Sequence, residues 1–494
     1  MAFNSIEYFV FLAVVVAVFW TAPQRFRPQL LLLASYVFYG WWDWRLCGLL
    51  AFTTVSTWVG GALVHRADRR SVRITLLVYT LLLSLGVLVA FKVYGYFVAS
   101  LGATGSELAL LTPTVGLLVP VGLSFYTFQA VSYVVDVYRG QQKPEPSLVS
   151  YALFVSFFPH LLAGPILRAR RLIPELKELP QRLEPVARAE GLELLLTGLF
   201  KKVCVGDVLT ASAAAIGTTD TADGTFMMLV GLSTALIGAY FDIAGYIDIA
   251  RGSAKLLGVY LQPNFAQPLT RSRTLTDFWR RWQITVMAWF RDYVYLPVRG
   301  RSRSVPRELV AVFAVFAAVG IWHGGSSLGW AVWAVSTTAV LVAERIVRER
   351  RVLRTRERRR AAVAAGGGAA TPTPASGPPP TPSPLRRAGQ VLYVWAVLLF
   401  TVCWLAADDL GGGVDLLSRV VLPRGGPFDL DGFVFLVYGV LALLLFDRRE
   451  LRVLALEGRP DPPGNVRIAA FALMVAGIVV FSGQASVPFL YFRF

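Results

Sequence analysis

The sequence predicts an all-α polytopic membrane protein with about 12 transmembrane helices plus re-entrant and interfacial helices. Two observations predict this fold class. Hydrophobic residues make up 55% of the 494-residue chain and charged residues only 16%, which is more apolar surface than a soluble protein of this size can bury. Apolar runs of about 17 to 25 residues, long enough to cross a hydrocarbon core roughly 30 Å thick, recur along the whole chain. We therefore expect many crossings and no large soluble domain.

Arginines in short loops between the apolar runs account for much of the net charge of +17. No nucleic-acid-binding module accompanies them, so we expect membrane lipids rather than nucleic acid as partners. Basic loops mark the cytoplasmic side of a membrane protein. Arg25 and Arg27 place the first loop inside, and the apolar run before them lacks a basic leader and a cleavage site. We therefore expect a retained first span and an N-terminus that lies outside.

Loop charges alternate along the first half of the chain, as expected for a chain that crosses back and forth. One stretch departs from this pattern: residues 148–166 have basic residues on both flanks and contain Pro159, Gly164 and Pro165, which favours a re-entrant or interfacial element. Residues 168–190 read as an amphipathic cytoplasmic segment at the headgroups. The remaining runs predicted to cross are 29–46, 47–64, 74–100, 113–136, 191–216 and 226–250.

The second half contains a linker that divides the chain. Residues 251–307 are basic and aromatic and contain no clean span, after which 309–323 and 328–345 go out and back. Residues 346–387 are first basic, as a solvated helix or arm, and then rich in Pro, Gly and Thr, a composition that cannot build a core. We expect a multi-span core at 1–345 and C-terminal helices at 388–494 that complete the fold. Their runs lie near 388–406, 433–446 and 465–482, with an acidic outer loop between the first two.

The stretch AAVGIWHGGSSLGW, residues 317–330, contains one histidine in an apolar run. From Leu309 to His323 is fourteen helical steps, roughly 21 Å, so a helix that begins at the inner surface has not yet crossed a core of about 30 Å. An ionisable residue at that depth suggests a function, and desolvation keeps its imidazole neutral. A neutral imidazole can take a proton from a hydroxyl; alternatively, His323 bridges two helices by hydrogen bonds.

The stretch TLTDFWRRWQITVMAWFRDYVYLPVRG, residues 274–300, is the second candidate site. If it forms one helix, its two faces differ in polarity. The aromatic face contains Trp279, Trp282, Val286, Trp289 and Tyr293, and the polar face contains Arg280, Gln283, Met287 and Arg291. Such a helix either anchors the protein at the interface, or lines a polar tunnel that binds an anionic donor through arginine and the Gln283 amide.

The other polar residues in apolar surroundings have structural interpretations. Asp242 and Asp248 are six residues apart and do not share a helical face, so we expect ion pairs with nearby arginines rather than a paired acid and base. His65 begins a basic loop and is expected at the surface, and His160 is expected to pack or cap. The three cysteines are far apart and predict neither a disulfide framework nor a metal site.

Six blocks, in order along nearly the whole chain, resemble landmarks of the membrane-bound O-acyltransferase family, and most closely the bacterial branch for alginate O-acetylation and teichoic acid D-alanylation. The blocks are VPVGLSFYTFQAVSYVVDVYRG at 119–140, FFPHLLAGPILR at 157–168, YFDIAGYIDIARG at 240–252, the stretch 264–300, GIWHG at 320–324 and the terminal PFLYFRF. The resemblance implies a multi-helix funnel around a thin central region, in a bacterial inner (plasma) membrane.

The resemblance also implies an activity. The family's members pass an acyl group, here acetyl or another short acyl group, from a cytoplasmic thioester to a hydroxyl of a cell-surface polysaccharide, lipid or secreted acceptor. The donor substrate is acyl-CoA or an acyl carrier protein, no cofactor is bound, and related systems work with a separate extracytoplasmic acyltransferase. By motif, His323 corresponds to the family's intramembrane histidine, the general base that deprotonates the acceptor hydroxyl. The supporting or substrate-binding residues that we expect are Gln283, Trp322, Arg280, Trp279, Trp282 and Arg291.

The chain departs from the branch at one position. Gln283 stands where the bacterial branch usually has a second histidine, in its FWRRWH block, and a glutamine cannot be a general base; it can only orient a group by hydrogen bonding. Two other functions therefore stay open at this point. One is a transporter or flippase for an acyl carrier or lipid-linked glycan, and the other is a catalytically impaired scaffold.

Overall fold

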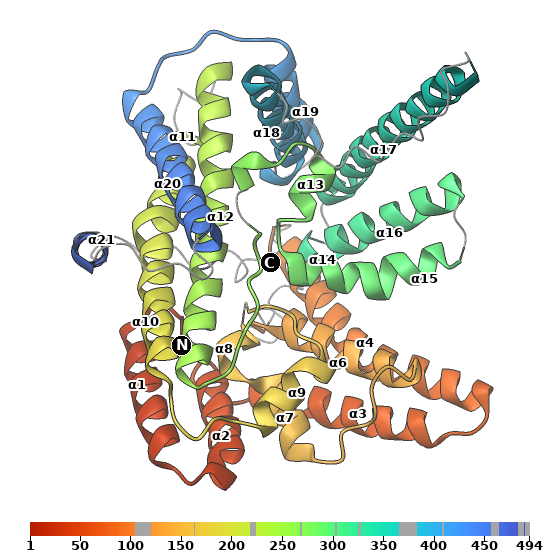
Figure 1. The fold of residues 1–494 in the computed structure, drawn as a ribbon, viewed down its shortest axis with the longest axis vertical. Coiled ribbons are helices and arrows are strands. Elements are labelled where there is room, and N and C mark those ends of the chain that lie inside the picture. The colour runs from red at the N-terminus through yellow and green to blue at the C-terminus, as the bar shows by residue number, and fades with distance from the viewer. Residues whose placement is uncertain are drawn as a thin grey trace.

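The computed structural model describes residues 1–103, 120–162, 164–217, 224–266, 269–301, 304–324, 328–364, 383–407, 410–455, 464–482 and 489. Within these ranges every regular element is a helix (Figure 1). In the part of the chain that the structure describes, seven helices are long and apolar enough to cross a membrane: Leu46–Arg66, Arg70–Phe91, Thr225–Leu256, Val305–His323, Leu328–Arg358, Pro384–Leu405 and Leu430–Arg448. The all-α, multi-pass architecture is therefore confirmed, whereas the count of about 12 spans stays a prediction.

Helices in the N-terminal part overlap each predicted apolar run, although residues 113–119 of the run 113–136 lie outside the described residues. The first of these helices are α1 (Ile6–Thr21), α2 (Arg27–Gly40), α3 (Leu46–Arg66), α4 (Arg70–Ala103) and α6 (Leu123–Tyr138). α3 packs against both α4 and α6. Close approach depends on two neighbouring glycines of α3, since a β-carbon on Gly60 would overlap Thr80 of α4 and one on Gly61 would overlap Tyr133 of α6.

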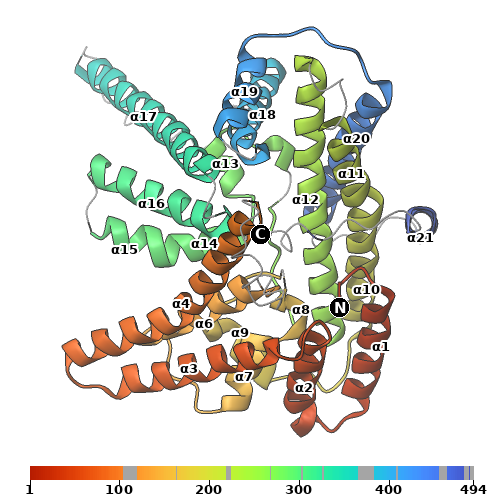
Figure 2. The same cartoon turned by 180° about the vertical axis from the view of Figure 1, so that it is seen from behind.

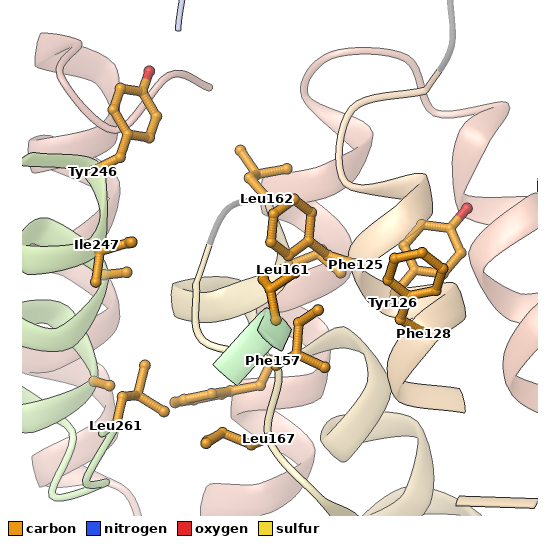
Figure 3. Packing of buried hydrophobic residues seen from close by; sticks show 14 of the residues in the cluster. Phe125, Tyr126, Phe128, Phe157, Leu161, Leu162, Leu167, Tyr246, Ile247 and Leu261 are labelled. Carbon is orange, nitrogen blue, oxygen red and sulfur yellow. The ribbon is translucent and has the colours of Figure 1, made fainter. Parts of the chain in front are cut away.

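The stretch predicted to be re-entrant or interfacial is broken, as expected. α7 (Leu148–Ser156) is followed by Phe157 as its C-cap, and α8 (Phe158–Leu161) is a single turn. A nine-residue helix is about 13 Å long and cannot cross a core of roughly 30 Å. Figure 3 shows Leu161 and Leu162 between apolar side chains of α6 and Tyr246 of α12 (Thr225–Leu256). The broken backbone is thus covered by protein, as a membrane environment requires.

Part of the next stretch is amphipathic, as predicted. α9 (Ala169–Lys177) buries Leu172, Ile173 and Leu176 and leaves Arg171 exposed. The amphipathic helix is shorter than the predicted segment 168–190. The last residues of that segment belong to the next helix, α10 (Pro185–Phe200). α10 continues through a π-helical segment, η2 (Lys201–Asp207), into α11 (Val208–Gly217).

α12 is the central helix of one half of the molecule. α10, η2 and α11 pack along it, and α18 (Pro384–Ala406) and α20 (Leu430–Ala455) cover it from the C-terminal part (Figure 2). Facing glycines bring α10 and α12 into backbone contact: a β-carbon on Gly198 would lie 2.6 Å from the carbonyl oxygen of Gly245. Only small residues permit so close a seam.

Buried ion pairs line the same seam. Lys201 Nζ lies 2.6 Å from Asp248 Oδ2, and Lys202 Nζ lies 2.5 Å from Asp207 and 2.6 Å from Asp242. Both lysine side chains are buried. The expectation that the two aspartates of α12 form ion pairs is confirmed, and their partners include lysines as well as an arginine, since Arg251 lies 3.1 Å from Asp248. Lys202, the partner of Asp242, belongs to the π-helical segment.

The region predicted to lack a clean span is a series of short elements. They are η4 (Leu269–Arg271), α13 (Leu275–Trp279), α14 (Ile284–Phe290), the π-helical η5 (Arg291–Tyr295) and α15 (Leu296–Arg299). α16 (Val305–Gly324) and α17 (Leu328–Ala364) then form a tightly packed pair. α17 extends well beyond its partner (Figure 1), and its exposed, arginine-rich end is the predicted basic arm.

The C-terminal helices pack on helices of the N-terminal part. α18 packs on α17, α20 on α12 and α21 (Gly464–Phe481) on α10. An additional helix, α19 (Leu410–Val421), forms within the predicted acidic loop. The division at residue 346 stays a prediction, and α17 continues through it. Residues 365–382 of the linker and the terminal PFLYFRF block, except Phe489, lie outside the described residues.

Candidate active site

His323 lies between two tryptophan rings near the end of α16. The centroid of its imidazole is 4.3 Å from that of Trp322 and 5.0 Å from that of Trp330 on α17, whose ring is parallel to it within 6°. Close contact between the two helices makes this stack possible, because a β-carbon on Gly320 would lie 3.2 Å from the carbonyl oxygen of Trp330. The imidazole is partly exposed. The two indole rings restrict the orientation of the imidazole plane and leave the imidazole partly accessible.

Trp322 anchors the end of α16 in an aromatic cluster. Its ring centroid lies 6.1 Å from Phe125 and 5.4 Å from Phe128 of α6, and 6.1 Å from Phe290 of α14. Trp289 joins the same cluster, since its ring stacks on Phe128 at 4.4 Å and its Nε1 donates to the Phe128 carbonyl oxygen at 2.8 Å. α6, α14 and α16 are therefore fixed relative to one another beside His323.

Residues 274–300 do not form the single helix that the two predicted faces require. α13 ends at Trp279, residues 280–283 form a bend, and α14 begins at Ile284. Gln283 breaks the helix, because its φ of 47° and ψ of 52° lie in the left-handed region, which a right-handed helix cannot contain. The residues on either side of the bend therefore do not share one aromatic face.

The tryptophans before and after the bend contact different helices. Trp279 lies 5.4 Å from Phe316 of α16 and 6.1 Å from Trp333 of α17, measured between ring centroids. Trp282 lies against Tyr240 of α12 at 6.1 Å, whereas Trp289 belongs to the cluster on α6. Burial against three different helices explains why these aromatic residues do not form a stripe.

The two candidate arginines lie at opposite ends of α14. Arg280 is exposed within the bend, and Arg291 is exposed at the start of η5, where its guanidinium lies 2.8 Å from Asp292. The bend separates them, so the predicted polar face that would join Arg280, Gln283 and Arg291 does not exist.

Asn264 holds Gln283 in its left-handed conformation. Asn264 Nδ2 donates to Gln283 Oε1 at 2.6 Å, and its carbonyl oxygen accepts from the N–H of Ile284 at 2.8 Å. Asn264 Oδ1 accepts from the backbone N–H and the hydroxyl of Thr285, at 2.8 and 2.7 Å. A left-handed non-glycine residue costs of order 1 kcal/mol or more, which these buried hydrogen bonds offset.

The elements on both sides of the Gln283 bend contact α16. α13 contacts α16 at Phe316, and α14 contacts Trp322 through Phe290. Figure 1 shows α13 and α14 beside those ends of α16 and α17 that lie nearer the middle of the molecule. Residues 325–327, which the sequence places next to His323, lie outside the described residues.

Two arginines, which the sequence did not predict to be site residues, cluster at η5. Arg168 lies 3.1 Å from the Asp292 carboxylate, and Arg139 donates to the Asp292 carbonyl oxygen at 3.1 Å. Both guanidinium groups lie over the ring of Tyr293, at 4.6 and 5.3 Å. Burial raises the pKa of Tyr293, so its hydroxyl stays a neutral donor, to Asp136 at 2.8 Å. Two short stretches of the sequence contain these arginines: VYRG has Arg139 before its last residue, and GPILR ends at Arg168.

The two other histidines behave as expected. His160 is buried, and its Nε2 lies 2.9 Å from Gln129 Oε1, so the imidazole donates to an amide oxygen. His65 is exposed at the end of α3. His323 is thus the histidine that combines partial exposure with a ring stacked on a tryptophan. A neutral imidazole can accept a proton, the amide of Gln283 can donate a hydrogen bond, and arginines such as Arg139 and Arg168 can bind an anion.

Comparison with known proteins agrees with this chemistry. Residues 141–369, which include the bend and His323, match the model of the membrane-bound O-acyltransferase family. The chain is 35% identical to the probable alginate O-acetylase AlgI of Azotobacter vinelandii over 367 residues, 70% of each chain. It is 30% identical to the peptidoglycan O-acetyltransferase of Helicobacter pylori over 340 residues, 63% of this chain and 62% of that protein.

A more distant relative transfers a different group. The chain is 28% identical to the teichoic acid D-alanyltransferase of Bacillus subtilis over 222 residues, 41% of this chain and 53% of that protein. The relatives are enzymes that transfer acyl groups, which favours an enzyme over a transporter or a scaffold. The chain is an O-acyltransferase embedded in a membrane, and it belongs to the membrane-bound O-acyltransferase family.

Proposed function

We propose that the protein transfers an acetyl or other short acyl group from a cytoplasmic thioester to a hydroxyl of a cell-surface polysaccharide. The names of two relatives, an alginate O-acetylase and a peptidoglycan O-acetyltransferase, support both the group and the class of acceptor. The observation that carries the proposal is the position of His323, held between Trp322 and Trp330 at the end of α16.

His323 is the general base in this proposal. Its neutral imidazole accepts the proton of the acceptor hydroxyl, and the hydroxyl oxygen attacks the carbonyl carbon of the thioester. The tetrahedral intermediate carries a negative oxygen, which accepts a hydrogen bond from the Gln283 amide. The C–S bond then breaks, the ester forms, and the thiolate takes the proton back from the imidazolium. A positioned base of this kind contributes typically 10²- to 10⁴-fold to a rate.

The arginine cluster supports an anionic donor that arrives from the cytoplasm. Arg139 and Arg168 belong to stretches that the charge pattern assigns to the inner side of the membrane. Arginine binds phosphate oxygens in a bidentate geometry, and acyl-CoA and the prosthetic group of an acyl carrier protein both carry phosphate. The geometry at η5 therefore suits either donor.

The acetylation of surface polysaccharide in cells tests this proposal. Isogenic bacterial strains with and without the intact gene are compared by the acetate that mild alkali releases from purified surface polysaccharide. We expect ester-bound acetate only in the strain that has the gene, and return of the acetate when the full chain is supplied from a plasmid. Equal amounts of ester-bound acyl groups in both strains would refute the proposal.

A further inference from the structure

An apolar cavity of about 50 Å³ lies where α12, α18 and α20 meet η4 and α13. Its wall is almost entirely hydrophobic and includes the aromatic side chains of Tyr240, Trp282 and Trp395. A cavity needs roughly 10 to 15 Å³ to hold one water molecule, but water also needs polar partners, which this wall provides poorly. The cavity therefore favours hydrocarbon, and because it is partly open, a longer chain can enter it from outside.

One polar group in the cavity wall has no hydrogen bond. Ser272 lines the cavity and is only 2% exposed, and its hydroxyl has no hydrogen-bond partner among the described residues. The hydroxyl of the nearby Thr270, by contrast, donates to the Asp447 carboxylate. A buried hydroxyl without a partner is destabilising. A ligand that brings an acceptor atom into the cavity would satisfy it.

Carboxylates hold the segment that contains Ser272 at both of its ends. Asp447 of α20 accepts from two N–H groups of η4, at 3.2 and 2.9 Å. Glu344 of α17 accepts from two N–H groups in the first turn of α13, at 2.6 and 3.0 Å, and from the hydroxyl of Tyr393 on α18 at 3.1 Å. Ser272 therefore has a fixed position relative to α17, α18 and α20.

The same contacts place Ser272 near the basic ends of three helices. Arg448 follows directly after Asp447 and is the last residue of a candidate span. The basic arm of α17 begins after Glu344, and α18 has two arginines in its first turn, about two turns before Tyr393. Because basic residues mark the cytoplasmic side, we expect the mouth of the cavity to lie at the inner headgroups.

Two exposed arginines flank Ser272 in the sequence. Arg271 and Arg273 are exposed, whereas Ser272 between them is buried in the cavity wall. Basic residues between transmembrane helices on the cytoplasmic side bind the headgroups of anionic lipids. The order of positive charge, hydroxyl donor and apolar cavity matches the order of phosphate, ester carbonyl and hydrocarbon in a glycerophospholipid.

We propose that the cavity binds an anionic glycerophospholipid of the cytoplasmic leaflet. Part of one acyl chain occupies the cavity, Arg271 and Arg273 bind the headgroup, and the Ser272 hydroxyl donates to an ester carbonyl oxygen. The lipid thereby joins α18 and α20 of the C-terminal part to η4 and α13. This binding site is additional to the proposed acyl transfer and does not depend on it.

Binding of a labelled lipid tests the proposal. Purified full-length protein in mixed micelles of detergent and dioleoyl phosphatidylcholine is titrated with radiolabelled dioleoyl phosphatidylglycerol, which has the same chains and a net negative headgroup. We expect saturable binding, with phosphatidylglycerol at least about 10-fold stronger than phosphatidylcholine as a competitor. The variant Arg271→Gln/Arg273→Gln should lose this preference. Equal competition by the two lipids against the wild-type protein would overturn the inference.

The ester contact is tested with a second lipid. Diether phosphatidylglycerol has the same headgroup and hydrocarbon chains of the same length but no ester carbonyl group. We expect Ser272→Ala to weaken binding of the diester lipid by about 3- to 10-fold and to leave binding of the diether lipid unchanged. A merely structural effect of Ser272→Ala would weaken the binding of both lipids equally, and that result would overturn the proposed contact.

A matched pair of tryptophan variants on α18 tests whether the chain enters the cavity. Val391 lines the cavity, whereas the next residue, Leu392, is 68% exposed. Val391→Trp should fill the cavity and abolish saturable binding, and Leu392→Trp should bind like wild type. Equal binding by the two variants would contradict the proposal. If Val391→Trp does not fold, the comparison of diester and diether lipids decides. Displacement of the labelled lipid by acetyl-CoA would assign the cavity to the acyl donor instead and overturn the inference.

Discussion

Gln283 is the non-glycine residue with a positive φ among the residues that the structure describes. Backbone strain of this kind persists only where the surrounding contacts hold it, and such positions cluster at active sites. By the resemblance seen in the sequence, residue 283 is the position at which a second histidine is expected in the bacterial branch.

The strain at residue 283 predicts an unusual order of stabilities. Gln283→Ala and Gln283→Gly both remove the amide and its hydrogen bond to Asn264, but only alanine keeps a β-carbon at φ 47°. We expect the glycine variant to be more stable than the alanine variant by about 1 kcal/mol, because glycine adopts left-handed backbone without a steric cost. Thermal unfolding in detergent checks this. An alanine variant as stable as the glycine variant would show that the bend is unstrained.

The sequence could identify some of the site residues and not others. His323 and Trp322 stand out, because a histidine in an apolar run is rare and the family motif contains both. Asn264 carries no such signal, since its role depends on contacts to residues 283–285 that form only when two irregular segments meet. Arg168 has the same limitation, because its contact with Asp292 joins positions 124 residues apart.

The element that differs most from an ordinary helix is η2, where α10 passes through a π-helical segment before α11. Lys201 and Lys202 belong to this π-helical segment, and both are buried against aspartates of α12. Removing one member of a buried ion pair leaves an uncompensated charge, which typically costs 3 to 5 kcal/mol. An exposed pair is worth about 1 kcal/mol or less.

The difference between buried and exposed ion pairs predicts the effects of two lysine substitutions, one in η2 and one in α12. Lys202→Met should lower the free energy of unfolding by about 3 kcal/mol or more, because Asp207 and Asp242 lose their common partner. Lys255→Met is the control, because Lys255 pairs with an exposed Glu190 and its loss should cost about 1 kcal/mol or less. Neutralising both aspartates in the Lys202→Met protein should restore stability. Equal effects of the two single substitutions would contradict this account of the seam.

The length of apolar runs predicted the long helices well and predicted the short elements between residues 269 and 299 poorly. α3 matches its predicted run within two residues, and α12 begins one residue before its run and continues six residues beyond it, because uniform hydropathy and length determine a span. Periodicity across 274–300 predicted one helix, but tertiary contacts override it. Asn264 stabilises a left-handed residue in the middle, and Trp279 and Trp289 pack against different helices.

At the scale of the whole molecule, the α16–α17 pair connects the site to one end of the fold. Glu308, in the first turn of α16, forms an ion pair with Arg345, after which the exposed arm of α17 begins. His323 lies fifteen residues from Glu308, roughly 22 Å along the helix. If the arm is at the inner surface, the imidazole lies deep in a core of about 30 Å, as the sequence predicts.

Site-directed labelling tests this orientation. In a variant without native cysteines, Arg356→Cys places a thiol on the arm and Gly425→Cys places one in the loop before α20, where a side chain meets no atom within 4 Å. We expect a membrane-impermeant thiol reagent to label residue 425 in intact spheroplasts and residue 356 only in inside-out vesicles, because basic segments stay in the cytoplasm. Labelling of both thiols from the same side would contradict the predicted topology.

The central claim is that His323 removes the proton from the acceptor hydroxyl, and its most direct test is acyl transfer by purified His323→Ala protein in nanodiscs. We predict that kcat/KM falls by at least about 100-fold, while elution volume and thermal unfolding stay like those of wild type. His323→Gln, which keeps a polar group between Trp322 and Trp330, should lose as much activity, because an amide cannot accept a proton at neutral pH. Transfer at the wild-type rate by either folded variant would contradict the claim.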